Sequence, residues 1–266
     1  MNTERALMDK VLELERELQE RDNDLRACKN ATGEFIYLAS HDLRAPLRKL
    51  SVFTERLVYK SADVLGEESL SYIVRIENAV AAMHSLVDGL SAFSEISATD
   101  FDFRVCDLNN VLREAIKDLA LSIKENDADI QTSHLPQIEG NAPHLKTAFK
   151  HLISNSIKFK KQDVAPQILI ASELLQPEEK KVHGLPPDAI YHRIEFTDNG
   201  IGFKAEYAEK ILHAFQRLHP KSSYSGTGLG LAMCKKIIDK HHGLIYAEAN
   251  GNSGAKFILI LPKIRK

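Results

Sequence analysis

The segment SHDLRAPL contains a histidine that could act as a nucleophile, because His41 stands directly before Asp42. A neutral imidazole is a capable nucleophile near pH 7, and an adjacent carboxylate can hold its second nitrogen or accept a proton as a phosphoryl group arrives. A surface histidine beside a helix-capping acid would have the same sequence. The pair by itself therefore leaves both interpretations open.

A second polar group lies in the segment HLISNSIKFKK, which places His151, Asn155 and Lys158 on one face of an expected helix. An asparagine carbonyl oxygen is a hard ligand that suits Mg²⁺ carried in by a nucleotide. A lysine one turn later can neutralise phosphate charge. A solvated helix face is the alternative for these residues.

The segment FTDNGIGF ends an expected strand with Asp198 and then supplies Gly200 and Gly202. Glycines would let the backbone approach a flat ligand closely, and a buried aspartate could accept a hydrogen bond from an exocyclic amine such as that of adenine. A plain turn is the alternative, because Asp-Asn-Gly is a good turn sequence.

The segment YSGTGLGLAMCKKII places Gly226, Gly228 and Gly230 at the start of an amphipathic helix. Free amides at a helix N-terminus can bind phosphate, aided by the helix dipole. The chain has no GxxxxGK[ST] motif, and these glycines follow a polar loop instead of the strand that a dinucleotide fingerprint requires. Phosphate binding is therefore expected through neither of those two folds.

Two long helices must position His41. Apolar residues recur in steps of four and three, with one polar interruption, as in a coiled coil; they are Leu7, Val11, Leu14, Leu18, Leu25 and Cys28. A second helical stretch contains Pro46, which we expect to bend it. After a polar break at SADVLGEES, a further helical segment, SLSYIVRIENAVAAMHSLVDGLSAF, reaches Phe93. The two form an antiparallel hairpin, and two copies would most simply make a four-helix bundle.

The second half of the chain is expected to be α+β, with a boundary near Thr99. Alternating segments predict strands at QILIAS, YHRIEFTD, GLIYAEA and AKFILILP. Helices expected at 141–159 and 228–241 would cover one sheet and give a two-layer sandwich that positions Asn155, Asp198 and the glycines. The segment LQPEEKKVHGLPPDAI, with three prolines, is interpreted as a surface loop or hairpin.

The composition excludes several classes of protein. The 35 Lys plus Arg nearly balance the 37 Asp plus Glu, which argues against a nucleic-acid-coating protein. The three cysteines are far apart and without CxxC spacing, so neither a disulfide framework nor a zinc site is expected. No apolar run approaches the roughly 20 residues that span a bilayer, and no apolar signal core follows the charged start. We expect a soluble, cytoplasmic protein.

The order of five segments resembles the sensor histidine kinase family, from the coiled coil to the final strand. SHDLRAPL, HLISNSIKF, DNGIGF, FQRLH and GTGLGL look like its H, N, G1, F and G2 boxes. The first and fourth look most like phytochrome-type kinases. The resemblance implies a coiled-coil signalling helix at 1–34, a dimerisation and histidine-phosphotransfer domain at 35–98, and a GHKL-type catalytic ATP-binding domain at 99–266.

The resemblance also implies roles for individual residues, with ATP and Mg²⁺ as cofactors. His41 would be the phosphoacceptor and Asp42 its acidic neighbour. Asn155 would ligate Mg²⁺, Lys158 would face the phosphates, and Asp198 would bind adenine. A mobile lid would extend from about Lys204 to Tyr224. The remaining expected ATP contacts are Gly200, Gly202, Phe215 as the anchor of the lid, Gly226, Thr227, Gly228, Leu229 and Gly230.

The implied partners are a second copy of the chain, in a homodimer, and the receiver domain of a response regulator. The sensory input would come from an upstream domain or partner that is absent from this chain. His151 stands where the family commonly has asparagine, and Ala45 where many members have Thr or Asn, which weakens any phosphatase activity. The alternatives are a phosphotransfer scaffold without ATP turnover and a gyrase- or chaperone-like ATPase.

Overall fold

The computed structural model describes residues 2–61, 64–98, 101–218, 226–249 and 254–264. The chain divides into two compact units, Met1–Thr99 and Asp100–Lys266. The described part of the first unit consists of two helices and a short connection, and the second unit is a mixed α/β structure. This order of helices followed by an α/β unit confirms the predicted fold class, whereas the division into three functional parts stays a prediction.

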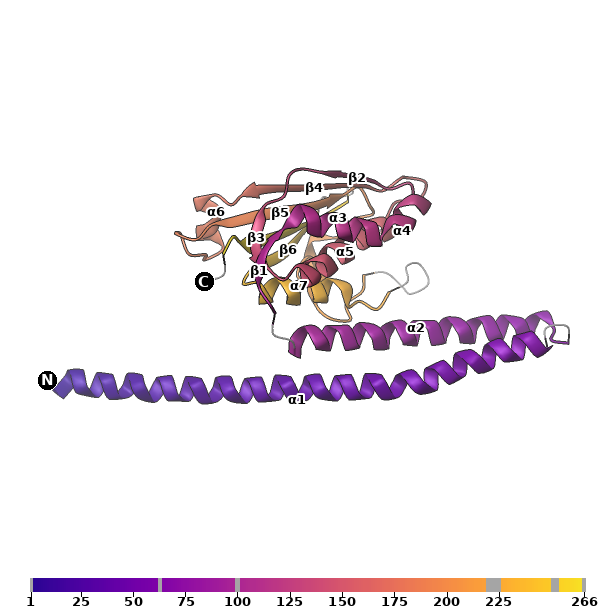
Figure 1. The fold of residues 1–266 in the computed structure, drawn as a ribbon, viewed down its shortest axis with the longest axis horizontal. Helices are drawn as coiled ribbons and strands as arrows, with labels where there is room; N and C mark the ends of the chain where they lie inside the picture. Colours follow the sequence, from indigo (N-terminus) through magenta and orange to yellow (C-terminus); the bar gives the residue numbers. More distant parts are fainter. Residues whose placement is uncertain (1, 62–63, 99–100, 219–225, 250–253, 265–266) are drawn as a thin grey trace. The chain divides into compact units, whose positions relative to one another are not determined.

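The helical unit is a hairpin of two long helices (Figure 1). Helix α1 spans Asn2–Ser61 and continues through Pro46, so the expected coiled coil and the segment that carries His41 form one helix. The ribbon curves over the C-terminal part of α1, and the N-terminal part extends beyond the end of α2, which spans Glu67–Ala98. A bent rather than broken helix follows because proline removes only one backbone hydrogen bond.

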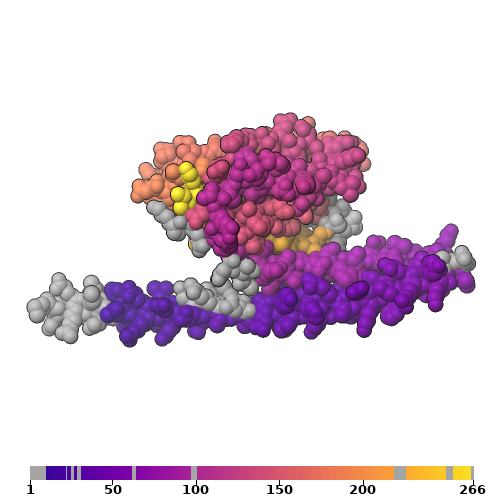
Figure 2. Space-filling model, in the orientation of Figure 1, coloured from indigo at the N-terminus to yellow at the C-terminus, as the bar shows by residue number. Residues whose placement is uncertain are grey.

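Apolar and polar contacts join the two helices of the hairpin. Leu47 of α1 packs with Val80 and Val87 of α2 in a buried cluster. The Ser94 hydroxyl donates to the Gly33 carbonyl oxygen at 2.8 Å, which fixes the pairing nearer the open end of the hairpin. The space-filling view in Figure 2 shows the side chains of α1 and α2 in contact along α2.

The α/β unit is built on a five-stranded sheet with the order β2-β4-β5-β7-β6. Strands β2 and β4 are parallel, and the other neighbouring pairs are antiparallel. The sheet strands are β2 (Asp129–Thr132), β4 (Gln167–Leu174), β5 (Tyr191–Asp198), β6 (Leu244–Ala249) and β7 (Ala255–Pro262). The four predicted strand segments are thus observed as β4, β5, β6 and β7.

Helices α3 (Leu108–Asp118), α5 (Ala142–Lys158) and α7 (Gly230–Lys240) cover one face of this sheet (Figure 1). Phe149 of α5 and Phe196 of β5 are fully buried and meet edge to face, with ring centroids 5.2 Å apart. A short helix α4 (Ala120–Glu125) follows α3, and β1 (Arg104–Asp107) pairs with β3 (Gln137–Gly140) in a separate two-stranded sheet. The predicted two-layer sandwich is therefore observed.

The segment expected to be a loop or hairpin instead contains helix α6 (Pro177–Val182), so that prediction was wrong. Gln176 and Glu179 form a reciprocal capping box, and Pro177 occupies the first turn, where its missing N–H costs nothing. The Arg193 guanidinium of β5 holds Glu179 at 2.9 Å. Together these contacts stabilise α6 on the sheet face opposite α5 and α7.

Gly243 follows α7 at a place where no larger residue fits. A Cβ there would meet the carbonyl oxygen of Ile260 and would lie 2.9 Å from Cδ2 of Leu261. We expect Gly243→Ala to lower the free energy of unfolding of the α/β unit by about 1–3 kcal/mol, because overpacking pushes neighbours apart. Urea denaturation followed by circular dichroism measures this. Gly66→Ala, whose Cβ would meet nothing within 4 Å, should leave that transition unchanged.

Candidate functional site

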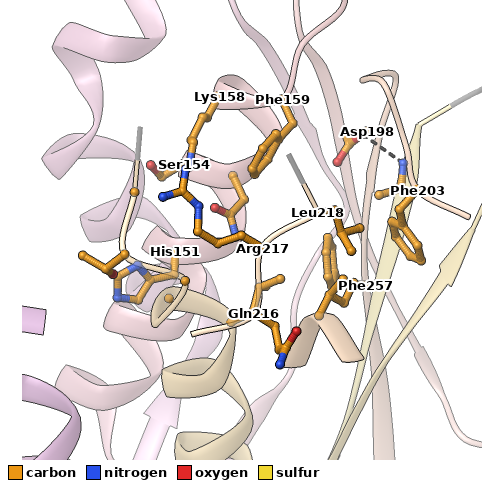
Figure 3. Close-up of a pocket in the computed structure, with 18 of the residues that line it drawn as sticks. His151, Ser154, Lys158, Phe159, Asp198, Phe203, Gln216, Arg217, Leu218 and Phe257 are labelled. Carbon is orange, nitrogen blue, oxygen red and sulfur yellow. Dashed lines mark hydrogen bonds between the residues drawn. The ribbon is translucent and has the colours of Figure 1, made fainter. Parts of the chain in front are cut away.

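The α/β unit contains a cavity of about 380 Å³ between α5, the N-terminus of α7, the end of β5 and the segment 201–218 (Figure 3). This volume is in the range that holds a small organic ligand. One side is formed by the cationic side chains Lys158 and Arg217, together with His151. The other side contains the buried Asp198 beside the aromatic rings of Phe203 and Phe257.

Helix α5 presents one polar face to this cavity. Asn141 caps its N-terminus by accepting from the backbone N–H of His144 at 3.1 Å, and the apolar face from Leu145 to Ile157 packs into the core. The helical period then directs the cavity-facing side chains the other way; they are His151, Ser154, Asn155 and Lys158. The predicted common face of this helix is thus observed, and it faces a cavity instead of bulk solvent.

Burial changes the charge behaviour of two of these groups. It lowers the pKa of His151, with a smaller contribution from the nearby Lys150, so the ring is neutral near pH 7. Burial also lowers the pKa of Lys158, and repulsion by Arg217 adds to this. Two cations held close together in a cavity favour an anionic ligand between them.

Asp198 ends β5 and is 8 % exposed. Its Oδ1 accepts from the backbone N–H groups of Gly200 and Ala255, both at 3.0 Å, and Oδ2 accepts from the Ser156 hydroxyl at 3.1 Å. Burial raises the pKa of this carboxyl, while the three hydrogen bonds oppose that rise. The carboxylate is fixed in direction and keeps acceptor capacity toward the cavity.

Glycines bring the backbone close to the cavity where side chains would block it. A Cβ on Gly226 would lie 2.6 Å from Nζ of Lys158, and one on Gly228 would lie 2.9 Å from the Gln216 carbonyl oxygen. Both have positive φ angles, 143° and 74°, which other residues rarely adopt. Only glycine satisfies both requirements at these two positions.

The cavity brings together most of the residues expected to bind ATP; these are Asn155, Lys158, Asp198, Gly202, Gly226, Thr227, Gly228 and Gly230. Gly200 lies behind Asp198, where a Cβ would be 2.5 Å from the Phe159 carbonyl oxygen. Leu229 is buried and precedes α7. These two residues support the site without lining it.

Phe215 was expected to anchor a lid with its ring, but its side chain is 56 % exposed and does not line the cavity. Its φ is 64°, and its backbone N–H donates to the Gly228 carbonyl oxygen at 2.9 Å. Of the expected lid, residues 219–224 lie outside the described residues. Residues 204–218 contain short 3₁₀ turns, with Ile211 and Leu212 buried.

Several cavity residues were not named individually in the sequence analysis, above all Arg217, which lies within the expected lid. Figure 3 shows its side chain reaching toward Lys158 and Ser154. The letters FQRLH offered a signal, because an arginine next to a phosphate-binding glycine segment is a natural anion ligand. The others are Ser154, Phe159, Phe203, Ile211, Gln216, Leu218, Leu231, Ala255 and Phe257.

His41 lies in the helical unit on α1, with its side chain 72 % exposed. Its Nδ1 is 3.2 Å from Oδ1 of Asp42. In the tautomer with the proton on Nδ1, this nitrogen donates to the Asp42 carboxylate and Nε2 keeps its lone pair. The predicted arrangement of nucleophile and orienting carboxylate is therefore present in the geometry, while its role stays a prediction.

Within the described residues, no group of three or more His, Cys, Asp or Glu side chains could hold a metal ion. A divalent cation at the cavity would therefore depend on oxygen atoms of its ligand as well as on protein groups such as the Asn155 amide. None of the helices in the described parts of the chain is both long and apolar enough to cross a membrane.

Comparisons with known proteins match both units. The family described as histidine kinase-, DNA gyrase B-, and HSP90-like ATPase matches residues 140–265. Cyanobacterial phytochrome A of Nostoc sp. is 32% identical over 97% of this chain and 32% of its own length. Phytochrome-like protein Cph1 of Synechocystis sp. is 30% identical over 97% of this chain and 33% of its own length. The chain thus spans about a third of the length of these relatives.

A solved structure supports the same fold. The crystal structure of full-length ShkA in complex with AMPPNP superposes with a TM-score of 0.61, covering 86% of this chain and 45% of that one, at 21% sequence identity. The cavity described above, with a buried carboxylate among aromatic rings at one side and two cations at the other, is chemically suited to a base attached to a phosphate chain.

Proposed function

This chain belongs to the sensor histidine kinases and carries their GHKL-type ATP-binding domain, and from that premise we propose that it autophosphorylates His41 from Mg-ATP. The phosphoryl group would then pass to an aspartate on the receiver domain of a response regulator. The observation that carries this proposal is the two-sided cavity, because its fixed acceptor Asp198 and its cations Lys158 and Arg217 match the two ends of ATP. The AMPPNP bound to ShkA supports the same ligand class.

ATP fits the residues present. The exocyclic amine of adenine would donate to Asp198, with the base beside Phe203 and Phe257. The phosphates would lie along the Gly226–Gly230 backbone, which glycine alone keeps open at two positions, with Thr227 also at the cavity. Lys158 and Arg217 would neutralise their charge. Phe215 and Gly200 would support this arrangement from behind.

Mg²⁺ also fits the donor set. The Asn155 side chain faces the cavity, and its carbonyl oxygen is the kind of hard ligand that Mg²⁺ takes alongside substrate phosphates. The ion would supply charge neutralisation on the phosphates. The protein residues would bind and orient the nucleotide and exclude water from it.

His41 would react through Nε2, because Nδ1 faces Asp42. The Nε2 lone pair would attack the γ-phosphorus, forming an N–P bond while the bond from phosphorus to the ADP oxygen breaks. The proton on Nδ1 would pass to Asp42 as positive charge develops on the ring. Positioning and charge neutralisation supply most of the catalysis in such a transfer.

Labelling with γ-labelled ATP tests the proposal. Phosphohistidine is lost in acid and survives in base, so an acid-labile, base-stable label on the full chain is the expected result. A phosphotransfer scaffold without ATP turnover would acquire no covalent label. A gyrase- or chaperone-like ATPase would release labelled phosphate without retaining any on the protein. Either outcome would contradict the proposal.

We further propose that the hairpin dimerises into a four-helix bundle. In a single chain, Leu43, Leu50 and Leu57 lie one heptad apart on α1 and are about half exposed, as is Ile76 on α2. Such a stripe of apolar surface is unfavourable in water unless a second copy covers it. The same proposal includes two partners, which are a sensory domain or protein that supplies the input and the receiver domain that accepts the phosphoryl group. It also includes a cytoplasmic location.

We expect the chain to be a dimer at micromolar concentration, because burying this stripe gains roughly 25 cal/mol for each Å² of apolar surface removed from water. Light scattering measures the mass. Leu50→Glu would place a charge within the covered stripe and should shift the mass toward the monomer. Glu55→Gln, on the exposed side of α1, is the matched control. A monomeric unaltered chain would contradict the prediction.

A further inference from the structure

The segment that enters the α/β unit after α2 is held by an aromatic contact. Only residues 99 and 100 separate Phe101 from the end of α2. The Phe101 ring stacks on the His144 ring of α5, with centroids 3.9 Å apart and 18° between the ring planes. The Lys240 ammonium of α7 lies 4.7 Å from the centroid of the Phe101 ring, and the His241 ring has its centroid 5.5 Å from it. Phe101 therefore occupies a socket formed by these three side chains.

The next two residues are held at the same place, and we call residues 101–103 the strap. The side-chain amide of Asn141 donates to the Asp102 carbonyl oxygen at 3.1 Å. The Phe103 ring meets the His241 ring edge to face, with centroids 5.1 Å apart. Ring pairs of this geometry, and a cation over an aromatic face, attract each other. All three strap residues thus contact the beginning of α5 or the end of α7.

His241 joins these two helices beneath the strap. Its side chain is buried, and Nδ1 lies 2.7 Å from the Ile237 carbonyl oxygen of α7. Nε2 accepts from the backbone N–H of Asn141, the N-cap of α5, at 3.0 Å. A carbonyl oxygen only accepts and an N–H only donates, so Nδ1 donates and both ring nitrogens are used. One imidazole therefore holds the end of α7 against the start of α5.

The other ends of the same two helices form part of the nucleotide cavity. Helix α5 lines it from His151 to Lys158, and α7 lines it with Gly230 and Leu231. The helices are tightly packed there, because a Cβ on Gly230 would lie 3.2 Å from Nδ1 of His151. Closely packed elements move together instead of deforming. A change in how α5 and α7 meet at the strap would therefore alter their spacing at the cavity.

We propose that the strap regulates nucleotide binding. Docked in its socket, it holds α5 and α7 in the arrangement that binds the nucleotide, and its release lowers nucleotide affinity. This inference rests on the proposed nucleotide-binding function. Because coupling between two sites is reciprocal, a bound nucleotide must favour the docked strap by the same factor. The short connection to α2 would let a displacement at the end of α2 reach the cavity through the strap.

Calorimetry of the full chain with Mg²⁺ and the β,γ-methylene analogue of ATP tests the first direction of this coupling. We expect Phe101→Ala to raise the dissociation constant about 5- to 20-fold, in the lower part of the range typical of coupled sites. Phe101→Tyr keeps the ring and should bind nearly as the unaltered chain does. Val105→Ala, which removes an exposed apolar side chain next to the strap, is the control and should leave the affinity unchanged. Circular dichroism checks that each variant is folded.

Hydrogen exchange tests the reverse direction, since amides exchange from locally opened states. Arg104 follows the strap and begins β1, where it pairs with Gly140. In the unaltered chain the analogue should slow exchange of the Arg104 amide by a factor similar to the affinity loss of Phe101→Ala. In Phe101→Ala the analogue should no longer slow it. The Met233 amide, which donates to the Leu229 carbonyl oxygen near the cavity, should still be slowed in both chains.

The outcomes separate the two proposals. Unchanged affinity in Phe101→Ala would overturn the role of the strap and leave the nucleotide site intact. Equal slowing of the Arg104 amide in both chains would overturn it as well, because a general stabilisation by the nucleotide does not depend on Phe101. Failure of the unaltered chain to bind the analogue would overturn the nucleotide site itself and the inference with it.

Discussion

Replacing His41 with glutamine should abolish acid-labile labelling of the chain by γ-labelled ATP. Glutamine occupies a similar volume and can still form hydrogen bonds, but its amide nitrogen has no available lone pair to attack phosphorus. The side chain lies on α1 and is largely exposed, so the substitution leaves no cavity in the hairpin core. The nucleotide cavity is formed by residues of the other unit. We therefore expect full loss of label with unchanged nucleotide affinity.

Two measurements are needed for this variant. Autoradiography before and after acid treatment gives the label, and calorimetry with the ATP analogue gives the affinity. His84→Gln, a half-buried histidine on α2, serves as the control and should label as the unaltered chain does. Acid-labile phosphate that remains on His41→Gln would show that another residue is the phosphoacceptor.

The regular elements were predictable because each follows from a local pattern. Strand β5 alternates partly buried and buried residues from Arg193 to Asp198, and α5 combines an Asn141 cap, an early proline and a continuous apolar face. Such patterns depend only on neighbours in sequence. Helix α6 had a comparable signal in the capping box of Gln176 and Glu179, but the three prolines around it favoured the interpretation as a loop.

The candidate site was predictable in part for a different reason. Residue type and spacing made Asn155, Lys158 and Asp198 candidates, and the resemblance of the five ordered segments selected them over the alternatives. The cavity brings the three together. Phe215 has a positive φ angle, which no pattern of residue types predicts, and its exposed ring does not line the cavity. The approach of Arg217 to Lys158 depends on how the segment after β5 folds back over α5, which is a long-range contact.

Asp198 shows how a long-range contact completes a locally predicted residue. Its Oδ1 accepts from Gly200, two residues away, but also from Ala255 at the start of β7. The second bond requires β5 and β7 to be neighbours in the sheet, which their sequences alone do not specify. Because both bonds use Oδ1 and Ser156 uses Oδ2, the direction of the carboxylate is set by three separate elements.

This geometry makes Asp198→Asn a sharp test of adenine recognition. An asparagine can keep its carbonyl oxygen at the Oδ1 position and so retain both backbone hydrogen bonds. Its amide nitrogen can then donate to the Ser156 hydroxyl, which can turn its own proton to the Leu152 carbonyl oxygen 3.2 Å away. The fold should therefore tolerate the change. What is lost is the acceptor facing the cavity, where an N–H would now meet the exocyclic amine of adenine, donor against donor.

We expect the dissociation constant for ATP to rise about 5- to 150-fold in Asp198→Asn, which corresponds to roughly 1–3 kcal/mol for a buried hydrogen bond turned into a mismatch. Calorimetry with the ATP analogue measures it, and Asp188→Asn, an exposed carboxylate in the segment after α6, is the control. Inosine triphosphate sharpens the test, because it has a carbonyl oxygen in place of the amine and could accept from the new N–H. The variant should lose affinity for ATP and lose less, or gain, for inosine triphosphate. Equal losses for both nucleotides would mean that Asp198 stabilises the cavity without contacting the base, since a purely structural defect does not distinguish a donor from an acceptor on the ligand.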